Sequence, residues 1–130
     1  MENWSKECPI AITICDKDGV IIDMNDKSRT TFIKNGKELI GENLMDCHPV
    51  HAQSVIRNLM ENHTVNAYTI EKEGVKKMIY QMPWFENGEF GGLVELSLVL
   101  PQEMPHFVRT PGKLKKTISR GSRRSPQKNT

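Results

Sequence analysis

Long apolar runs are missing from this sequence of 130 residues. The longest, residues 93–100, is interrupted by Glu95 and Ser97 and is far shorter than the roughly 20 residues that a helix needs to cross a bilayer. The first nine residues show no basic stretch followed by an apolar one, so no secretory signal is visible. Cysteine is scarce too, and three residues without regular spacing do not indicate a disulfide framework. Together these absences predict a cytoplasmic protein without a membrane span.

A catalytic constellation is also missing. The aspartates between residues 16 and 26 alternate with lysine and glycine, as turn and helix-cap residues do. No serine has a histidine and an acid at a recognisable spacing, and the glycines form no phosphate-binding loop. The length makes one domain, and the composition, with 37% hydrophobic and 26% charged residues, is ordinary for a globular protein. We therefore expect a sensor or binding module and not an enzyme.

What the sequence does contain is a set of β-prone segments joined by turns. Three tight-turn signals, Asp18-Gly19, Glu73-Gly74 and Asn87-Gly88, each connect two such segments, as antiparallel hairpins require. Residues 10–15 and 20–24 form the first predicted hairpin, and residues 65–73, 75–84 and 90–100 form three further strands in meander order. The pattern predicts a small antiparallel sheet with helices on one face.

Two helices are predicted between the first hairpin and the other strands. Asn25 or Asp26 caps the first, with Phe32 among its few apolar anchors. Pro49 suits the first position of the second helix, so we place His48 at its N-cap, where an extended conformation is preferred before proline. Apolar residues then follow at helical spacing and predict one buried stripe: Ala52, Val55, Ile56, Leu59 and Met60.

The charge of the chain is divided unevenly. Residues 1–100 hold 10 basic and 15 acidic residues, giving −5, whereas residues 101–130 hold 8 basic residues and one acidic residue, giving +7. Few apolar residues follow Val108, so the end of the chain cannot bury enough surface to offset its conformational entropy. We expect a lead-in at residues 1–8, a domain at residues 9–100 and a basic, disordered tail at residues 101–130.

Several local motifs resemble those of one family, the PAS domains. The opening PIAITICDKDGVIIDMND resembles the first PAS hairpin, with a turn of the form Asp-x-x-Gly and an Asn at the following helix start. Residues 41–44 (GENL) resemble the GxxL element before the long helix, and residues 90–96 (FGGLVEL) resemble the last strand. Residues 45–49 (MDCHP) are similar to a bacterial and archaeal subgroup with a Cys-His-Pro step. The resemblance covers roughly residues 8–100.

The resemblance implies an α+β fold, in which a five-stranded antiparallel sheet carries helices packed on one face. It also implies a role in signal transduction, by sensing a small ligand, light or redox state or by dimer contacts, with regulation of transcription among the expected processes. No kinase, cyclase or DNA-binding sequence follows the last strand, so we expect a homodimer that acts on a signalling protein in trans.

Residues 47–51 (CHPVH) are the sharpest candidates for a cofactor site. Cys47, His48 and His51 are of the ligand types that a haem iron or a zinc ion takes, although too few ligands lie nearby for zinc. The alternative is structural, with Cys47 a small buried thiol, His48 a cap and His51 solvated. The photochemical cysteine of light-sensing PAS domains is replaced by Leu44, which leaves only a non-covalent flavin open.

The strand at residues 78–84 alternates methionine and aromatic residues on one side. Met78, Tyr80 and Met82 suit an irregular apolar pocket, for example one for a fatty acid, and we predict that Phe32 and Met60 line it with them. Plain core and a dimer contact face that includes Trp84 are the alternatives.

The basic residues of segment 109–128 would suit phosphates of nucleic acid or an anionic membrane surface. A solvated linker is the alternative for this segment. The competing hypothesis for the whole chain is a dimeric adaptor without a ligand, whose basic tail contacts nucleic acid or a protein.

Overall fold

The computed structural model describes residues 1–32, 38–112 and 117–118. The chain divides into two units, residues 1–99 and 100–130, and each is described by itself. In the described part, no helix is sufficiently long and apolar to pass through a membrane.

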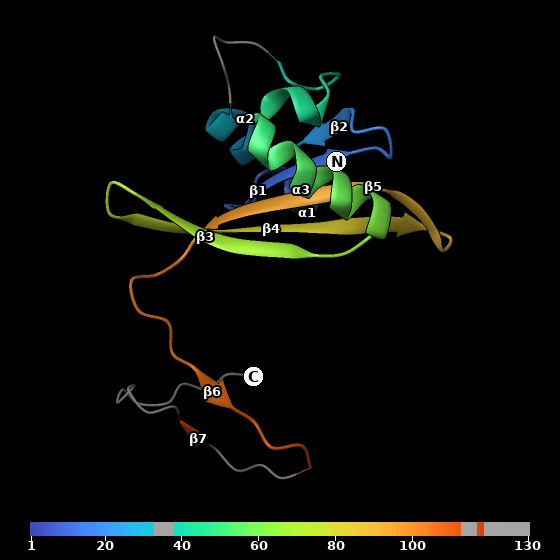
Figure 1. The fold of residues 1–130 in the computed structure, drawn as a ribbon. Helices are drawn as coiled ribbons and strands as arrows, with labels where there is room; N and C mark the ends of the chain where they lie inside the picture. Colours follow the sequence, from blue (N-terminus) through green and yellow to red (C-terminus); the bar gives the residue numbers. More distant parts are fainter. Residues whose placement is uncertain (33–37, 113–116, 119–130) are drawn as a thin grey trace. The chain divides into compact units, whose positions relative to one another are not determined.

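The first unit is built on one antiparallel sheet of five strands in the order β2-β1-β5-β4-β3 (Figure 1). Its elements, in chain order, are α1 (Asn3–Lys6), β1 (Ala11–Cys15), β2 (Ile21–Met24), α2 (Asp26–Phe32), the 3₁₀ helix η1 (Leu44–Cys47), α3 (Val50–Asn62), β3 (Asn66–Lys72), β4 (Val75–Glu86) and β5 (Glu89–Val99). β1 therefore pairs with β5, across the helical segment. The predicted fold class, an α+β fold with a five-stranded antiparallel sheet, is confirmed.

The three predicted turns all form. Glu73 and Gly74 have φ of 52° and 81°, and Asn87 and Gly88 have 53° and 81°, so both hairpins carry the positive φ pair of a type I′ turn. In the first hairpin, Asp16 Oδ1 accepts hydrogen bonds from the amides of Asp18 and Val20, at 2.9 and 3.0 Å. Each turn joins two antiparallel strands, as predicted.

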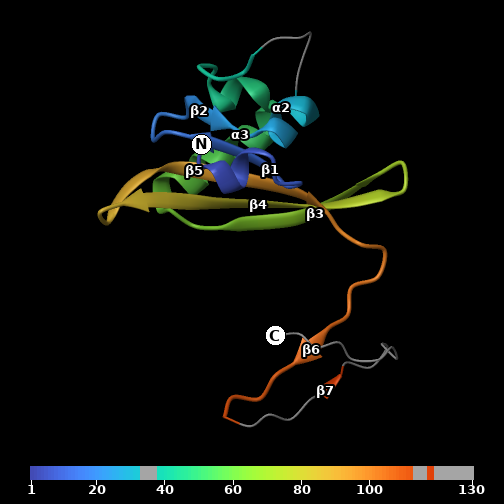
Figure 2. The same cartoon turned by 180° about the vertical axis from the view of Figure 1, so that it is seen from behind.

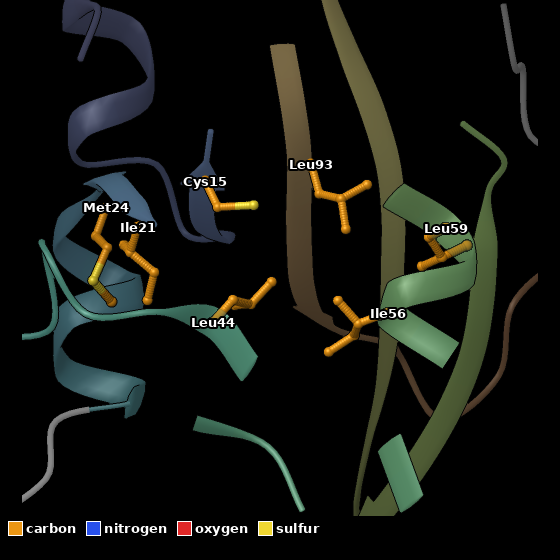
Figure 3. Close-up of a cluster of buried hydrophobic side chains, with 7 residues drawn as sticks. All are labelled: Cys15, Ile21, Met24, Leu44, Ile56, Leu59 and Leu93. Carbon is orange, nitrogen blue, oxygen red and sulfur yellow. The ribbon is translucent and has the colours of Figure 1, made fainter. Parts of the chain in front are cut away.

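The core lies between the sheet and the helices. Figure 3 shows its buried side chains converging from β1, β2, η1, α3 and β5: Cys15, Ile21, Met24, Leu44, Ile56, Leu59 and Leu93. Two members of the predicted helical stripe, Ile56 and Leu59, are fully buried, whereas Val55 is 43% exposed. The stripe is thus narrower than its sequence pattern predicted.

The start of α3 differs from the prediction by one residue. Pro49 is the N-cap, with φ −68° and ψ 160°, and the helix begins at Val50. His48 instead is the C-cap of η1, with an extended backbone and an amide that donates to the Met45 carbonyl oxygen. The preference of a pre-proline residue for extended backbone holds, but its assignment as the cap was wrong.

Asn25 ties three segments together at the start of α2. This side chain is completely buried, and its Oδ1 accepts from the amides of Ile12 and Ser28, at 2.9 and 3.0 Å. Its Nδ2 donates to the carbonyls of Ser5 and Ile10, at 2.9 and 2.8 Å. Asn25 therefore caps α2, as predicted, and also holds α1, which lies on the other side of β5 from α3 (Figures 1 and 2).

A bulge interrupts the β4–β5 ladder at Gly91, where the register shifts between Trp84 and Phe85. A Cβ at Gly91 would fall 2.4 Å from the Trp84 ring, and one at Gly92, where φ is 148°, would fall 2.0 Å from the Cys15 carbonyl oxygen. Only glycine allows these close approaches. From the sequence, the Gly91-Gly92 pair was predicted to mark a bulge or a turn exit, and the bulge is present.

Among the described residues of the second unit, β6 (Phe107–Val108) pairs with β7 (Thr117–Ile118) in a short ladder. We had expected no regular structure in this tail. Most of the basic segment 109–128 lies outside the described residues, so its predicted disorder and its nucleic-acid contact stay predictions.

Candidate functional site

A cavity of about 400 Å³ opens between the helices and the sheet of the first unit. Its apolar walls come from both layers: Ile21, Met24, Phe32, Leu39, Leu44, Ile70 and Ile79. Its polar lining is smaller: Thr13, Thr31, Cys47, His48, Tyr68 and Glu95. A mostly apolar cavity of this size with a few polar groups is typical of a site for a small molecule.

The strand period decides which residues reach this cavity. Successive side chains of a strand point to opposite faces, so Ile79 and Gln81 of β4 share the helix-covered face. Ile79 is opposite Ser97 on β5 and Tyr68 on β3, and all three are on that face. The intervening residues of β4 belong to the other face.

One row of the sheet brings polar residues from four strands under the helices. Glu95 of β5 is the register partner of Thr13 on β1 and of Gln81 on β4, and Gln81 is the partner of Asn66 on β3. Asn66 Nδ2 donates to Gln81 Oε1 at 2.8 Å, and Gln81 Nε2 donates to Glu95 Oε2 at 3.3 Å. The row therefore leads from the edge strand β3 to a carboxylate at the cavity.

His48 borders the cavity from the loop between η1 and α3. Its Nδ1 lies 3.0 Å from the Leu44 carbonyl oxygen, which can only accept a hydrogen bond. Nδ1 therefore carries a proton, and this bond orients the ring.

Burial raises the pKa of Glu95, and the nearby His48 and the hydrogen bond from Gln81 oppose this rise. Burial, and secondarily the charge of Glu95, also raises the pKa of Tyr68. The cavity thus holds a carboxylate in surroundings that disfavour its charge.

Comparisons with solved structures place this fold. The chain matches the PAS domain of a protein from Colwellia psychrerythraea with a TM-score of 0.56 and 20% identity, over 75% of this chain and 92% of that one. It matches the PAS domain of the histidine kinase ThkA with a TM-score of 0.55 and 24% identity, over 68% and 96%. The chain has the PAS fold.

A third PAS structure, the Aer2 receptor from Vibrio cholerae, is described as a dual PAS-heme oxygen sensor. It matches with a TM-score of 0.50 and 18% identity, over 71% of this chain and 95% of that one. No family model matches the sequence, and no curated protein matches it significantly. At these identities the likeness defines the fold, and the predicted subgroup with a Cys-His-Pro step stays a prediction.

Three of the predicted ligand-binding residues line the cavity of this PAS fold: Phe32, Cys47 and His48. Phe32 comes from the last turn of α2, and Cys47 and His48 lie at the end of η1. Whether they hold a cofactor such as haem or a non-covalent flavin stays a prediction. His48 is the single histidine among the described lining residues.

The other predicted ligand-binding residues do not line this cavity. His51 is exposed on the first turn of α3, and Met60 packs against the hydrophobic core. Met78, Tyr80 and Met82 alternate with Ile79 and Gln81 and therefore belong to the outer face of the sheet. The two alternatives given for this stripe, plain core and a dimer contact face, stay predictions.

Cys47, His48 and His51 do not form a metal site together. Within residues 1–32, 38–112 and 117–118, no group of three or more His, Cys, Asp or Glu side chains could hold a metal ion. His63 likewise has a structural role: it ends α3 in the left-handed conformation, with φ of 55°, and its ring stacks on Phe90 at 3.9 Å.

The sequence analysis missed Glu95 as a site residue, together with its partners Thr13 and Gln81. Glu95 had drawn notice only because it interrupts the apolar run at residues 93–100. The available signal was a charged residue at an inward position of an otherwise apolar strand. The register that aligns Glu95 with three other strands is not local, so the sequence did not indicate its partners.

Proposed function

We propose that residues 1–99 are a sensory PAS module that binds a small molecule in the cavity and passes the signal to a partner protein. The observation that carries this proposal is a mostly apolar cavity of about 400 Å³ with the Glu95 carboxylate at its wall. Occupation of the cavity changes the packing of helices on the sheet. A ligand shifts such an equilibrium by its differential affinity for the two arrangements.

Glu95 supports a binding role because a carboxylate at an inward position of the sheet does not stabilise the hydrophobic core. An apolar side chain at this inward position would pack without the penalty of a buried charge. A carboxyl group that lines a cavity and whose pKa is raised by burial is a candidate for a functional role. One neighbour of the same fold is the PAS domain of a histidine kinase and another is described as an oxygen sensor, which supports a role in signalling.

Native mass spectrometry of the purified protein, compared with its denatured mass, tests the proposal. We expect a mass excess that is lost on denaturation, as a non-covalent ligand requires. Ile79→Trp should abolish this excess, because Ile79 is buried and lines the cavity. Met78→Trp and Met82→Trp are matched controls on the outer face and should retain it.

A protein that stays without ligand, also after incubation with a cell extract, would contradict the binding role. Retention of ligand by a folded Ile79→Trp variant would show that the ligand lies elsewhere. Thermal unfolding of each variant separates loss of the ligand from loss of the fold.

A second role, homodimerisation, is favoured by the outer face of the sheet. Apolar side chains of β4 and β5 there are only partly buried: Met78, Tyr80, Met82, Val94, Leu96 and Leu98. A stable interface of this kind buries about 1,200–2,000 Å². Sedimentation should give a dimer that Leu96→Lys dissociates, and a monomer for the unchanged chain would exclude this role.

A further inference from the structure

The hydrogen-bonding capacity of the polar residues at the cavity indicates which class of ligand it can bind. Gln81 Oε1 is already engaged by Asn66 Nδ2, and Gln81 Nε2 donates to Glu95 Oε2. The hydrogen bonds therefore run in one direction, from Asn66 through Gln81 to Glu95. When Glu95 is ionised, its carboxylate can only accept hydrogen bonds. Glu95 itself lines the cavity, so its carboxylate is the acceptor that this row presents to a ligand.

His48 adds a second acceptor. Because Nδ1 donates to the Leu44 carbonyl, the neutral ring has its free electron pair on Nε2. Any positive charge on this ring would face Glu95, which is the one acidic residue among the described lining residues. Neither state supplies a spare positive charge for a ligand.

Positive charge is absent from the described lining of the cavity, which includes no lysine and no arginine. A ligand with a carboxylate or phosphate head would therefore meet Glu95 without a cation to hold it, or would require a proton on Glu95. A ligand with an ammonium head has three hydrogen-bond donors and a positive charge that would pair with the Glu95 carboxylate. The described lining of the cavity therefore disfavours a fatty acid, which the sequence had left open as a ligand.

We propose that the cavity binds a small amphiphilic amine, whose ammonium group donates to Glu95 and whose apolar body packs against Ile79 and Leu44. This inference rests on the proposed function, because it specifies the ligand class of the same cavity. Tyr68 and His48 then border the head group, and the apolar lining excludes water from the ion pair. Desolvation of a carboxylate is repaid only by a partner of opposite charge with good hydrogen-bond geometry.

Three probes with one apolar body test this assignment: 2-phenylethylamine, 2-phenylethanol and phenylacetate. Their dissociation constants for the full chain are measured by isothermal titration calorimetry at pH 7.5. We expect the amine to bind at least about tenfold more tightly than the alcohol, because tenfold corresponds to about 1.4 kcal/mol and a hydrogen bond to a charged group contributes at least that much. Phenylacetate should bind most weakly.

Glu95→Gln should abolish the advantage of the amine and leave the affinity for the alcohol within about threefold. Glu89→Gln is the matched control, because it removes the same charge from the exposed start of the same strand. It should leave all three affinities unchanged. If Glu95→Gln does not fold, the ranking of the probes by the unchanged chain decides.

The outcomes separate this inference from the proposed function. Binding of phenylacetate or of the alcohol as tightly as the amine overturns the amine assignment and leaves a ligand-binding cavity. If the native ligand is first removed and still no probe binds, only the amine assignment is overturned. No binding of any probe together with a ligand-free native mass overturns both.

Discussion

Replacement of Asn25 by alanine tests the central element of the fold, because this side chain joins α1, β1 and α2. The substitution leaves four backbone groups without their partner: the amides of Ile12 and Ser28 and the carbonyls of Ser5 and Ile10. Asn25 is completely buried, so water does not replace the lost bonds unless the segments separate.

The expected loss follows from these four bonds. Each contributes about 1 kcal/mol net, and a buried group left unpaired costs about 1–3 kcal/mol. Movement of α1 can expose the Ser5 and Ile10 carbonyls to water, which limits their share. We therefore expect Asn25→Ala to lower the free energy of unfolding by about 4 kcal/mol, a large part of the 5–15 kcal/mol of a typical domain.

Urea denaturation followed by circular dichroism measures this loss, with an unchanged m-value as evidence that the folded state is retained. Asn58→Ala on the exposed face of α3 is the control and should change the free energy by less than about 0.5 kcal/mol. Asn25→Asp separates donors from acceptors, because it keeps Oδ1 but presents a charge to two carbonyls. A loss below about 1 kcal/mol for Asn25→Ala would refute the assigned role.

Two further predictions concern Glu95 and the bulge. Burial raises the pKa of Glu95, so the folded state disfavours the charge of this carboxyl group. The protonated group therefore contributes its full share of stability at low pH. This contribution is lost as the pH rises through the pKa of the folded state. Glu95→Gln should thus be more stable than the unchanged chain at pH 8, with a gap that closes as pH falls; urea denaturation at several pH values that gave a constant gap would contradict this. Gly92→Ala should cost about 3 kcal/mol or more, since its Cβ would lie 2.0 Å from the Cys15 carbonyl oxygen, whereas Gly74→Ala, which has open space and φ of 81°, should cost about 1 kcal/mol. Equal melting temperatures for the two glycine variants would show that the clash is relieved.

The strands and turns were predictable because their signals are local. Asp18-Gly19, Glu73-Gly74 and Asn87-Gly88 need only the backbone freedom of the glycine and the preferences of its neighbour. The cap at Asn25 was local too, although its bonds to Ser5 and Ile10 were not. The start of α3 was misplaced by one residue, because a pre-proline pattern indicates an extended residue without telling which residue is the cap.

The site was predictable only in part. The motif at residues 47–51 indicated Cys47 and His48, and Phe32 was predicted as an apolar lining residue. Glu95, Gln81 and Thr13 meet through the register of three strands, and that register depends on the Gly91 bulge and on the pairing of β1 with β5. The outward placement of Met78 depends on the same registers, since a shift of one residue would bring it to the helix-covered face.

The edge strand β3 gives an independent reason to expect an occupant in the cavity. Tyr68 and Ile70 line the cavity, yet each is 44% exposed, because few contacts join the helices to this strand. An apolar ligand body would cover both side chains and gain roughly 25 cal/mol for each Å² of apolar surface removed from water. The same ligand would bring its head group to Glu95, two strands away. One molecule would then cover the exposed apolar side chains of β3 and pair the buried carboxylate. Its binding should therefore raise the stability of the domain, by about 2.7 kcal/mol at a hundredfold excess over the dissociation constant, and this gain should be smaller in Glu95→Gln, where only the apolar contribution is left.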